Sequence, residues 1–379
     1  MSHSDLQSLD GADYHILNHQ EVPSPALLVY ADLVEENIRV MRVLAGGVER
    51  LRPHMKTHKM AELIRLQLKL GITKFKSATI AEAELTAAAG APDVMLAYQP
   101  VGPNVVRMVQ LVRQYPHTKF SALVDDDGAT RALSSAFSEA GMTLAVMLDL
   151  DIGQHRCGIE PTPAAFELYR RVATMPGLSM EGLHAYDGHI HDSDLTERTK
   201  NCDAAFKPVE TLRQLLIDAG SPAPRVVAGG TPTFPIHARR PDVECSPGTC
   251  VFWDAGYRTK LPDLDKEFCV AAMLLTRVVS KPGGDRLCLD LGHKAVASEM
   301  PHPRVVFPEL PDARPITHSE EHLVVETASA GKFAVGDCLY GIPWHICPTV
   351  ALHASVVVVR NRRAVERWNV AARQRRLTI

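Results

Sequence analysis

The chain has 379 residues, of which 46% are hydrophobic, so it can bury the core of one large domain and a smaller one. Its net charge of −3 at pH 7 argues against bulk binding to nucleic acid or to an anionic membrane surface. No apolar run approaches the ~18 residues of a membrane span, and residues 1–14 lack the basic-then-apolar layout of a signal peptide. We therefore expect a cytoplasmic protein that binds neither nucleic acid nor membrane.

Short apolar runs alternate with helical patterns over the first two thirds of the chain. After a polar segment at 1–24, the pattern predicts strands at 26–30, 51–58, 74–78, 93–99, 120–124, 144–150, 180–186 and 225–228, and helices at 32–45, 60–70, 80–90, 105–115, 128–141, 163–175 and 203–220. Strict alternation predicts a parallel sheet, and eight units predict an α/β fold of the (β/α)8 TIM-like barrel type. A doubly wound open sheet is the alternative, but no Gly-x-Gly-x-x-Gly sequence follows the first strand.

The pattern changes in the last third of the chain. β-rich runs at 268–275, 286–290, 322–325 and 355–359 are separated by turn signals such as the Lys-Pro-Gly-Gly sequence at 281–284. We therefore predict a barrel domain over residues 25–257 and a second, all-β domain over residues 258–379. The eight cysteines include no Cys-x-x-Cys pair, so we expect buried free thiols rather than a zinc ribbon or a redox pair.

One basic stretch, Arg-Pro-His-Met-Lys-Thr-His-Lys at 52–59, stands out from ordinary surface charge. On a strand, His54, Lys56 and His58 would point to the same face, because side chains alternate with period two. A lysine among other cations, partly removed from water, becomes a nucleophilic amine that can form a Schiff base. A solvated basic turn is the alternative.

Further candidates follow the later strands, where the loops of a barrel build its active site. Gly229, Gly230 and Thr231 end the eighth predicted strand, and two glycines with a threonine can hold a phosphate group, although a plain turn has the same sequence. Far downstream, His345 and Cys347 lie two residues apart, so on a strand they would face one way. Imidazole and thiolate together suit Zn²⁺; a structural pair is the alternative.

The 52–59 stretch resembles the R-P-H-x-K-T-H-K motif of the D-threonine aldolase and D-serine dehydratase family. These are fold-type III pyridoxal phosphate (PLP) enzymes with the barrel of alanine racemase. The likeness runs from about Pro23 to past Pro348. It implies that Lys56 carries PLP, that the protein is a homodimer, and that residues 1–24 pack on the second domain.

The resemblance also implies roles for residues elsewhere. Arg156, in a G-x-x-R-x-G pattern, would approach the phenolic oxygen of PLP, which suits a guanidinium that never deprotonates, and Tyr186 would meet the pyridine nitrogen. The phosphate would be held by Gly229, Gly230 and Thr231 and by a second loop containing Gly248 and Thr249. His345 and Cys347 would hold a divalent metal, zinc in the first place, with manganese or magnesium as alternatives.

The activity implied is that of a PLP- and metal-dependent lyase acting on a small-molecule D-3-hydroxy amino acid. Lys56 would take the Cα proton, and we favour dehydration of the D-serine dehydratase type, giving a 2-oxo acid and ammonia. The His-x-Cys pair resembles dehydratases, whereas Pro348 and Thr349 after it resemble aldolases.

Other activities stay open. D-threonine aldolase-type retro-aldol cleavage to glycine and an aldehyde is the first alternative, and an amino-acid racemase or a non-catalytic PLP-binding protein are the others. Aldolases of the family place a histidine where this chain has Asp192; His191, one residue earlier, is a second catalytic candidate. Glu321 and His322 resemble the family's E-H-G, and we expect either a buried structural pair or support for the site.

Overall fold

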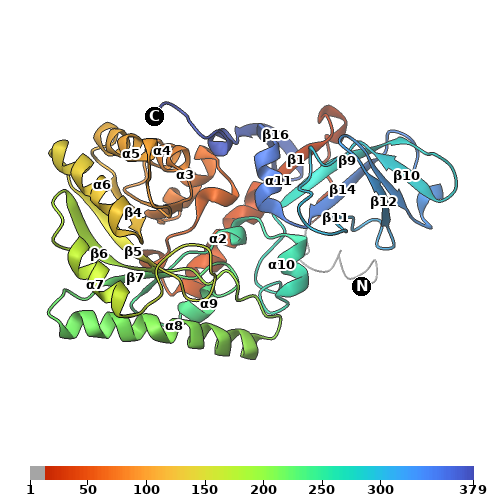
Figure 1. Ribbon diagram of the computed structural model, residues 1–379. Helices are drawn as coiled ribbons and strands as arrows, with labels where there is room; N and C mark the ends of the chain where they lie inside the picture. Colours follow the sequence, from red (N-terminus) through yellow and green to blue (C-terminus); the bar gives the residue numbers. More distant parts are fainter. Residues whose placement is uncertain (1–12) are drawn as a thin grey trace. The chain divides into compact units, whose positions relative to one another are not determined.

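The computed structural model describes residues 13–379, so the first half of the 1–24 segment, with its expected packing, lies outside the described residues. The chain forms two compact units. One, called here the barrel unit, comprises residues 41–56, 60–248 and 374–379. The other, the β unit, comprises the residues up to 40, residues 57–59 and residues 249–373. The elements of both are labelled in Figure 1.

The barrel unit is built on parallel strands that follow one another in sequence order. They are β2 (Lys74–Ser77), β3 (Asp93–Leu96), β4 (Lys119–Val124), β5 (Leu144–Leu150), β6 (Leu178–Ala185), β7 (Arg225–Ala228) and β8 (Val243–Cys245). Two isolated parallel bridges, Leu51 to Cys245 and His54 to Lys76, place residues 51–54 between β8 and β2. That segment takes the eighth position and closes the barrel.

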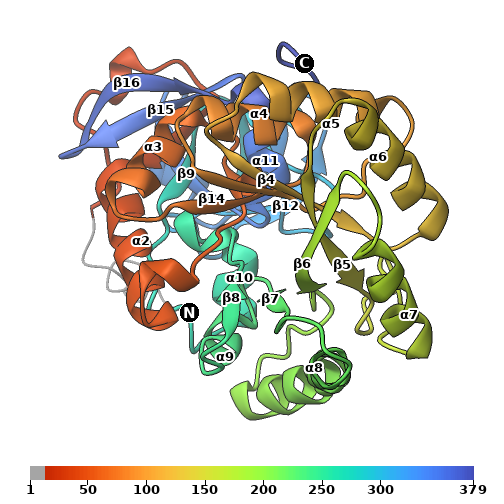
Figure 2. The ribbon, with the colours of Figure 1, turned by 90° about the vertical axis from the view of Figure 1, so that its left-hand side faces the viewer.

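Helices surround these strands on the outside (Figure 2). They are α3 (Ala61–Lys69), α4 (Ile80–Ala88), α5 (Pro103–Gln114), α6 (Asp127–Glu139), α7 (Pro163–Val172), α8 (Leu195–Asp218) and the short α9 (Phe234–His237). Side chains that accept a backbone N–H start three of them: Thr79 for α4, Asp126 for α6 and Asp194 for α8. Inside the sheet, a buried cluster from four strands fills the core: Met95, Leu123, Met147 and Val227.

The β unit contains a nine-stranded sheet. Its strands are β1 (Ala26–Tyr30), β9 (Ala272–Ser280), β10 (Arg286–Leu289), β11 (Val305–Val306), β12 (Arg314–His318), β13 (Leu323–Glu326), β14 (Cys338–Pro343), β15 (Ser355–Arg360) and β16 (Arg363–Asn369). The main path runs β12-β13-β10-β9-β1-β15-β16, and β14 pairs with both β9 and β11. The unit also holds α10 (Ala255–Lys260) and α11 (Ile346–Leu352), and α2 (Ala31–Ala45) follows β1.

Short 3-10 helices complete the secondary structure. They are η1 (His19–Glu21), η2 (Val48–Arg50), η3 (Met55–Thr57), η4 (Thr249–Val251), η5 (Ala330–Lys332) and η6 (Ala371–Arg373). Two of them, η3 and η4, bear on the site described below.

The predicted fold class is confirmed: a TIM-like parallel barrel and a separate, mostly β domain. Several details were wrong. The segment Ala26–Tyr30 is not a barrel strand; it pairs antiparallel with β9 and parallel with β15 in the other sheet. The missing barrel strand is β8, whose three residues, Val-Glu-Cys, are too few to show a period. Residues 51–58 do not form one strand, because the chain turns into η3 after His54.

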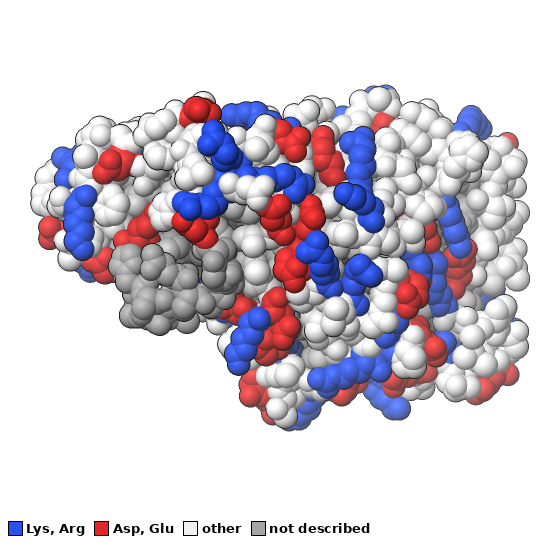
Figure 3. All heavy atoms as spheres, turned by 180° about the vertical axis from the view of Figure 1, so that it is seen from behind, with Lys and Arg blue, Asp and Glu red and all other residues white. Residues whose placement is uncertain are grey.

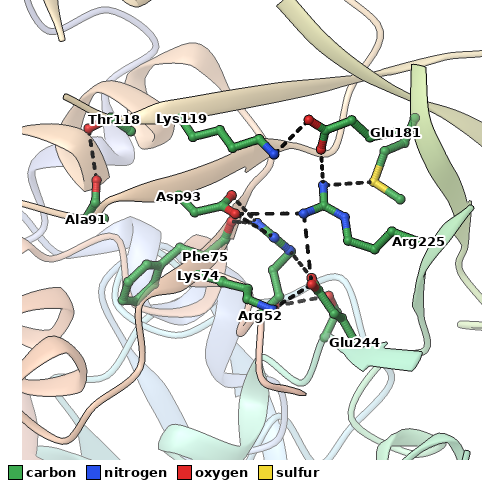
Figure 4. Close-up of polar contacts among 12 residues, drawn as sticks. Arg52, Lys74, Phe75, Ala91, Asp93, Thr118, Lys119, Glu181, Arg225 and Glu244 are labelled. Atoms are coloured by element: carbon green, nitrogen blue, oxygen red, sulfur yellow. Dashed lines mark hydrogen bonds and ion pairs between the residues drawn. The ribbon is translucent and has the colours of Figure 1, made fainter. Parts of the chain in front are cut away.

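Ion pairs occupy the starts of the barrel strands (Figure 4). Arg52 is fully buried and lies 2.7 Å from Asp93 and 2.8 Å from Glu244. Lys74 shares Glu244, at 2.7 Å. Nearby, Lys119 and Arg225 bind Glu181 at 2.7 and 2.9 Å. Because parallel strands all start at the same end, this network closes one end of the barrel and leaves the carboxyl ends for a site.

On the face drawn in Figure 3, lysines and arginines are mixed with aspartates and glutamates. That face carries no broad area of a single sign, such as a nucleic-acid surface would need. Among the described residues, no helix is both long and apolar enough to cross a membrane.

Candidate active site

Lys56 lies where the 51–54 strand segment ends and η3 begins. The segment is fixed on both sides, since His54 N–H donates to the Pro247 carbonyl at 2.8 Å and Lys76 N–H donates to the Pro53 carbonyl at 2.9 Å. Lys56 N–H also lies 3.4 Å from His54 Nδ1. The lysine is half-buried at the carboxyl end of a barrel strand, as the motif predicted. The predicted alternation is wrong, because a 3-10 turn does not have the two-residue period of a strand.

Tyr186 and Arg156, predicted from two separate loops, come together in the structure. Tyr186 directly follows β6, and the Arg156 guanidinium carbon lies 4.8 Å from the centre of its ring. A second cation, Lys76 Nζ, lies 5.8 Å from the same ring centre. A guanidinium next to an aromatic ring at strand ends can bind an anionic oxygen on a planar cofactor.

The structure adds a buried polar chain that sequence analysis missed. Lys76 Nζ lies 3.4 Å from His184 Nε2, and His184 Nδ1 lies 2.7 Å from Asp149 Oδ1. The carboxylate can only accept, so His184 Nδ1 carries the proton and Nε2 accepts from the lysine. The sequence signal that could have indicated this chain is the presence of polar residues at 76, 149 and 184 inside otherwise apolar strands.

Burial and, after it, the nearby charge of Lys56 together lower the pKa of Lys76 to about 7, against the opposing effect of Asp149 and Asp187. Burial likewise lowers the pKa of His184, outweighing the attraction of Asp149. A neutral imidazole and an easily deprotonated amine therefore lie among the predicted cofactor residues.

The loop after β7 has the form expected of a phosphate cradle. Gly229 has φ +79°, and a Cβ there would lie 2.6 Å from the His237 ring; a Cβ at Gly230 would lie 3.1 Å from the Tyr186 ring. A side chain at Gly229 would clash with the His237 ring, and one at Gly230 would require the Tyr186 ring to shift, so glycine at these positions lets the backbone approach a ligand. Gly248 N–H donates to Thr231 Oγ1 at 3.2 Å, which joins the two predicted phosphate loops. These residues fit a bound PLP.

Thr249 is placed differently from its neighbour Gly248. It begins η4 in the β unit, and its hydroxyl lies 3.6 Å from Cys347 Sγ. Its predicted role in holding phosphate remains a proposal.

A buried cluster lies behind the cradle. Asp187 accepts hydrogen bonds from Thr233 Oγ1 at 2.7 Å and His237 Nε2 at 2.8 Å, and Cys202 Sγ lies 3.5 Å from the same nitrogen. The Asp187, Cys202 and His237 side chains could together hold a metal ion. However, Arg240 donates to His237 Nδ1 at 3.1 Å, so Nε2 carries the proton that goes to Asp187.

No imidazole lone pair is then left for a metal, and a guanidinium faces the cluster. Burial raises the pKa of Cys202 to about 12, so its sulfur stays a thiol, which is a poor ligand. We interpret this cluster as support for the cradle. Its carboxylate holds the His237 ring that Gly229 packs against.

His345 and Cys347 start α11 in the β unit. His345 is the N-cap and Cys347 the second helical residue, so the expected strand is wrong, and the helix makes this domain mostly β rather than all-β. His345 Nδ1 lies 2.6 Å from Glu299 Oε1. Cys347 Sγ lies 3.3 Å from Thr57 Oγ1. Asp254 fixes the start of the helix by accepting from Ile346 N–H at 3.0 Å.

The two side chains contact each other despite the helical start. Burial lowers the pKa of His345, but its hydrogen bond to Cys347, the charge of Cys347 and the hydrogen bond to Glu299 outweigh burial and raise the pKa to about 9. A nitrogen and a sulfur donor thus lie together, as the resemblance implied, and this donor set fits a zinc ion.

The structure does not join every candidate to the site. His191 is exposed, its Nδ1 lies 2.8 Å from the His189 carbonyl, and none of the hydrogen bonds within residues 13–379 links it to another predicted site residue. Glu321 is exposed and paired with Lys294 at 3.3 Å, and His322 is exposed as well. The buried structural pair, one of the two alternatives for residues 321–322, is therefore wrong.

Comparison with known proteins agrees with this geometry. The family model of the alanine racemase N-terminal domain matches residues 29–255, and a serine dehydratase domain model matches residues 271–359. D-threonine aldolase from Arthrobacter sp is 31% identical over 93% of each chain. The chain belongs to the D-threonine aldolase and D-serine dehydratase family of PLP enzymes. The protein is a PLP-dependent lyase, which argues against the racemase and the non-catalytic PLP-binding protein.

Other members of the family differ in reaction. A 3-hydroxy-D-aspartate aldolase from Paracoccus denitrificans (strain Pd 1222) is 30% identical, covering 97% of this chain and 95% of the relative. A D-threo-3-hydroxyaspartate dehydratase from Delftia sp. (strain HT23) is 30% identical over 61% of each chain. Among solved structures, the D-threonine aldolase of Filomicrobium marinum superposes with a TM-score of 0.87 at 29% identity, covering 96% of this chain and 98% of that one.

Proposed function

We propose that this lyase dehydrates a D-3-hydroxy amino acid, giving a 2-oxo acid and ammonia. Lys56 would hold PLP through its Nζ, Arg156 would bind the phenolic oxygen, and Tyr186 would meet the ring nitrogen. The glycine loop, which consists of Gly229, Gly230 and Thr231, would hold the phosphate together with Gly248 through backbone N–H groups. PLP, when bound, supplies the electron sink that stabilises negative charge at Cα. Lys56 Nζ would be the base that takes the Cα proton of the substrate.

We further propose that His345 and Cys347 hold a divalent metal, zinc in the first place, with manganese or magnesium as alternatives. A metal there would supply Lewis-acid chemistry for the substrate β-hydroxyl. Two protein donors leave positions open for water and substrate, which is typical of a catalytic metal site. The neighbouring Thr57 and Thr249 hydroxyls can hydrogen-bond the sulfur.

The observation that carries the choice of dehydration is the contact between the His345 imidazole and the Cys347 thiol. In this family the His-x-Cys pair is that of dehydratases, whereas aldolases have His-x-Asp. The chain also has Asp192 where family aldolases have a histidine, and Asp192 Oδ2 is engaged by Asn201 at 3.1 Å. His191 is exposed beside it and remains a proposed second base.

Retro-aldol cleavage to glycine and an aldehyde is the second candidate. Three curated relatives align in sequence over more than 90% of this chain, and all three are aldolases. The dehydratase relative aligns over 61%. The reaction therefore has to be decided by its products.

The experiment is product analysis of the PLP- and zinc-loaded protein with D-serine, D-threonine and 3-hydroxy-D-aspartate. We expect pyruvate or the corresponding 2-oxo acid with one ammonia per turnover. Lys56→Ala should abolish both the activity and the visible absorbance of lysine-bound PLP, and the exposed Lys200 serves as the control, as Lys200→Ala. Glycine and an aldehyde as the main products would establish the aldolase instead.

We also infer that the protein is a homodimer, which rests on the family resemblance, and that it is cytoplasmic, as expected from its sequence. Light scattering of the purified protein would show a single-chain mass if the dimer is wrong, and fractionation of the source cells tests the compartment.

A further inference from the structure

We propose that Glu299 is a positioning residue for the metal site: it fixes the tautomer and the orientation of His345. The inference rests on the proposed metal pair and deepens it. Glu299 Oε1 lies 2.6 Å from His345 Nδ1. A carboxylate accepts but does not donate when ionised, so Nδ1 carries a proton and Nε2 is the nitrogen left to bind a metal. Carboxylate partners of this kind are common behind metal-bound histidines.

Glu299 is held in place by its own loop. The loop connects β10 to β11, and two of its backbone groups are anchored: Ala297 N–H donates to Thr349 Oγ1 at 3.1 Å, and the Met300 carbonyl accepts from Arg304 Nε at 3.0 Å. Thr349 is fully buried and donates to the His345 carbonyl at 2.8 Å. The Thr349 hydroxyl thus connects the loop that carries Glu299 to His345, the residue that Glu299 contacts.

The sulfur ligand is prepared in a similar way. Thr57 Oγ1 and Thr249 Oγ1 lie 3.3 and 3.6 Å from Cys347 Sγ. Cys347 Sγ donates to Thr57 Oγ1, and a hydroxyl can also donate to the sulfur, so both contacts orient the Cys347 side chain. Both proposed metal ligands, His345 and Cys347, therefore have polar partners that orient them in the absence of a metal. Such partners hold the ligands in the geometry that a metal requires.

A surface ion pair is the competing interpretation of the Glu299 contact, because both side chains are nearly half exposed, at 45% and 44%. An exposed ion pair contributes little to stability, and on this interpretation Glu299 would not orient His345 for a metal. A positioning carboxylate changes metal affinity by about 10- to 100-fold when it is removed. Metal affinity therefore separates the two interpretations.

The test measures Zn²⁺ affinity of the PLP-loaded protein by competition with a chelator. Glu299→Ala should bind Zn²⁺ about 10- to 100-fold more weakly. Glu299→Gln should lose less, because its amide oxygen still accepts from Nδ1. Glu321→Ala is the matched control, since it removes an exposed carboxylate of the same unit that pairs with Lys294, and it should bind Zn²⁺ like the wild type. The visible bands of bound Co²⁺ should shift in Glu299→Ala alone.

The inference is overturned if Glu299→Ala binds Zn²⁺ like the wild type, or if Glu299→Gln loses as much affinity as Glu299→Ala. His345→Ala separates this failure from failure of the proposed function. If His345→Ala keeps wild-type Zn²⁺ affinity, the metal pair itself is wrong. If His345→Ala loses the metal while Glu299→Ala keeps it, the pair stands and only the role of Glu299 is refuted.

Discussion

Lys76 is a fully buried amine in the barrel unit, close to the lysine proposed to carry PLP. Its Nζ lies 3.4 Å from His184 Nε2 and 5.8 Å from the centre of the Tyr186 ring. Removing an ammonium group from water favours its neutral form. The pKa of about 7 means that Lys76 changes charge near neutral pH.

This titration predicts how stability depends on pH. In the unfolded chain Lys76 keeps its proton up to its ordinary pKa of 10.5, whereas in the folded chain it loses the proton above about 7. The unfolded state therefore binds more protons between these values, and the free energy of unfolding should rise with pH by at most about 1.4 kcal/mol per unit. Below pH 7 both states are protonated and the cost of burying the charge is fully present.

Urea unfolding at pH 7, 8 and 9 measures the effect, with the same cofactor state throughout. The free energy of unfolding of Lys76→Met should rise less steeply with pH than that of the wild type. The stability difference should therefore change in favour of the wild type as the pH rises. Lys200→Met, at an exposed lysine, should keep the wild-type slope. Parallel slopes for the wild type and Lys76→Met would show that Lys76 is protonated in the folded protein throughout this range.

At the scale of one element, the 51–54 segment connects the ion-pair network at one end of the barrel to the proposed PLP lysine at the other end. Its second residue, Arg52, belongs to the ion-pair network (Figure 4). Lys56 lies two residues beyond the end of the segment. Arg52 holds Asp93 and Glu244, and its guanidinium and their hydrogen bonds lower the pKa of both carboxyls despite burial, which alone would raise it.

Arg52→Ala should destabilise the protein by about 3–5 kcal/mol, because it leaves two largely buried carboxylates without their main partner. The measurement is the free energy of unfolding in urea at pH 7. Arg131→Ala is the control, since Arg131 forms an exposed pair with Asp127 one turn away on α6 and should cost only about 0.3–0.5 kcal/mol. A loss below about 1 kcal/mol for Arg52→Ala would mean that Lys74 and Arg225 compensate for it.

At the scale of the whole molecule, the proposed cofactor and metal residues divide between the two units. Lys56, Arg156, Tyr186, the glycine loop and Gly248 belong to the barrel unit, whereas His345, Cys347 and Thr249 belong to the β unit. The two sites can therefore be emptied separately.

Chelation to verified metal depletion should abolish turnover while PLP stays bound, because the residues proposed to hold PLP are nearly all outside the unit that holds the metal ligands. The measurements are product formation, metal content and the visible absorbance of PLP on one sample, followed by restoration with Zn²⁺. An unchanged rate without metal would refute the Lewis-acid role, and loss of PLP with the metal would make the metal structural.

The sequence by itself determined the alternation of strands and helices, the barrel that follows from it, the change to a β-rich second domain, and the candidate residues of the site. These depend on local signals: hydrophobic period, turn residues and a long basic motif. Arg156 and Tyr186, 30 positions apart, could be placed together because parallel strands bring their following loops to one end of the barrel.

Only the tertiary structure decided which sheet takes Ala26–Tyr30, since five buried residues look the same in a parallel barrel and in the middle of a mixed sheet. It also decided that a three-residue strand, β8, completes the barrel, and that His345 caps a helix. Lys76 with His184, and Glu299 with His345, are partners separated by 108 and 46 residues. Contacts at such separations leave no local pattern, because they are selected by packing between elements rather than by the propensities within one.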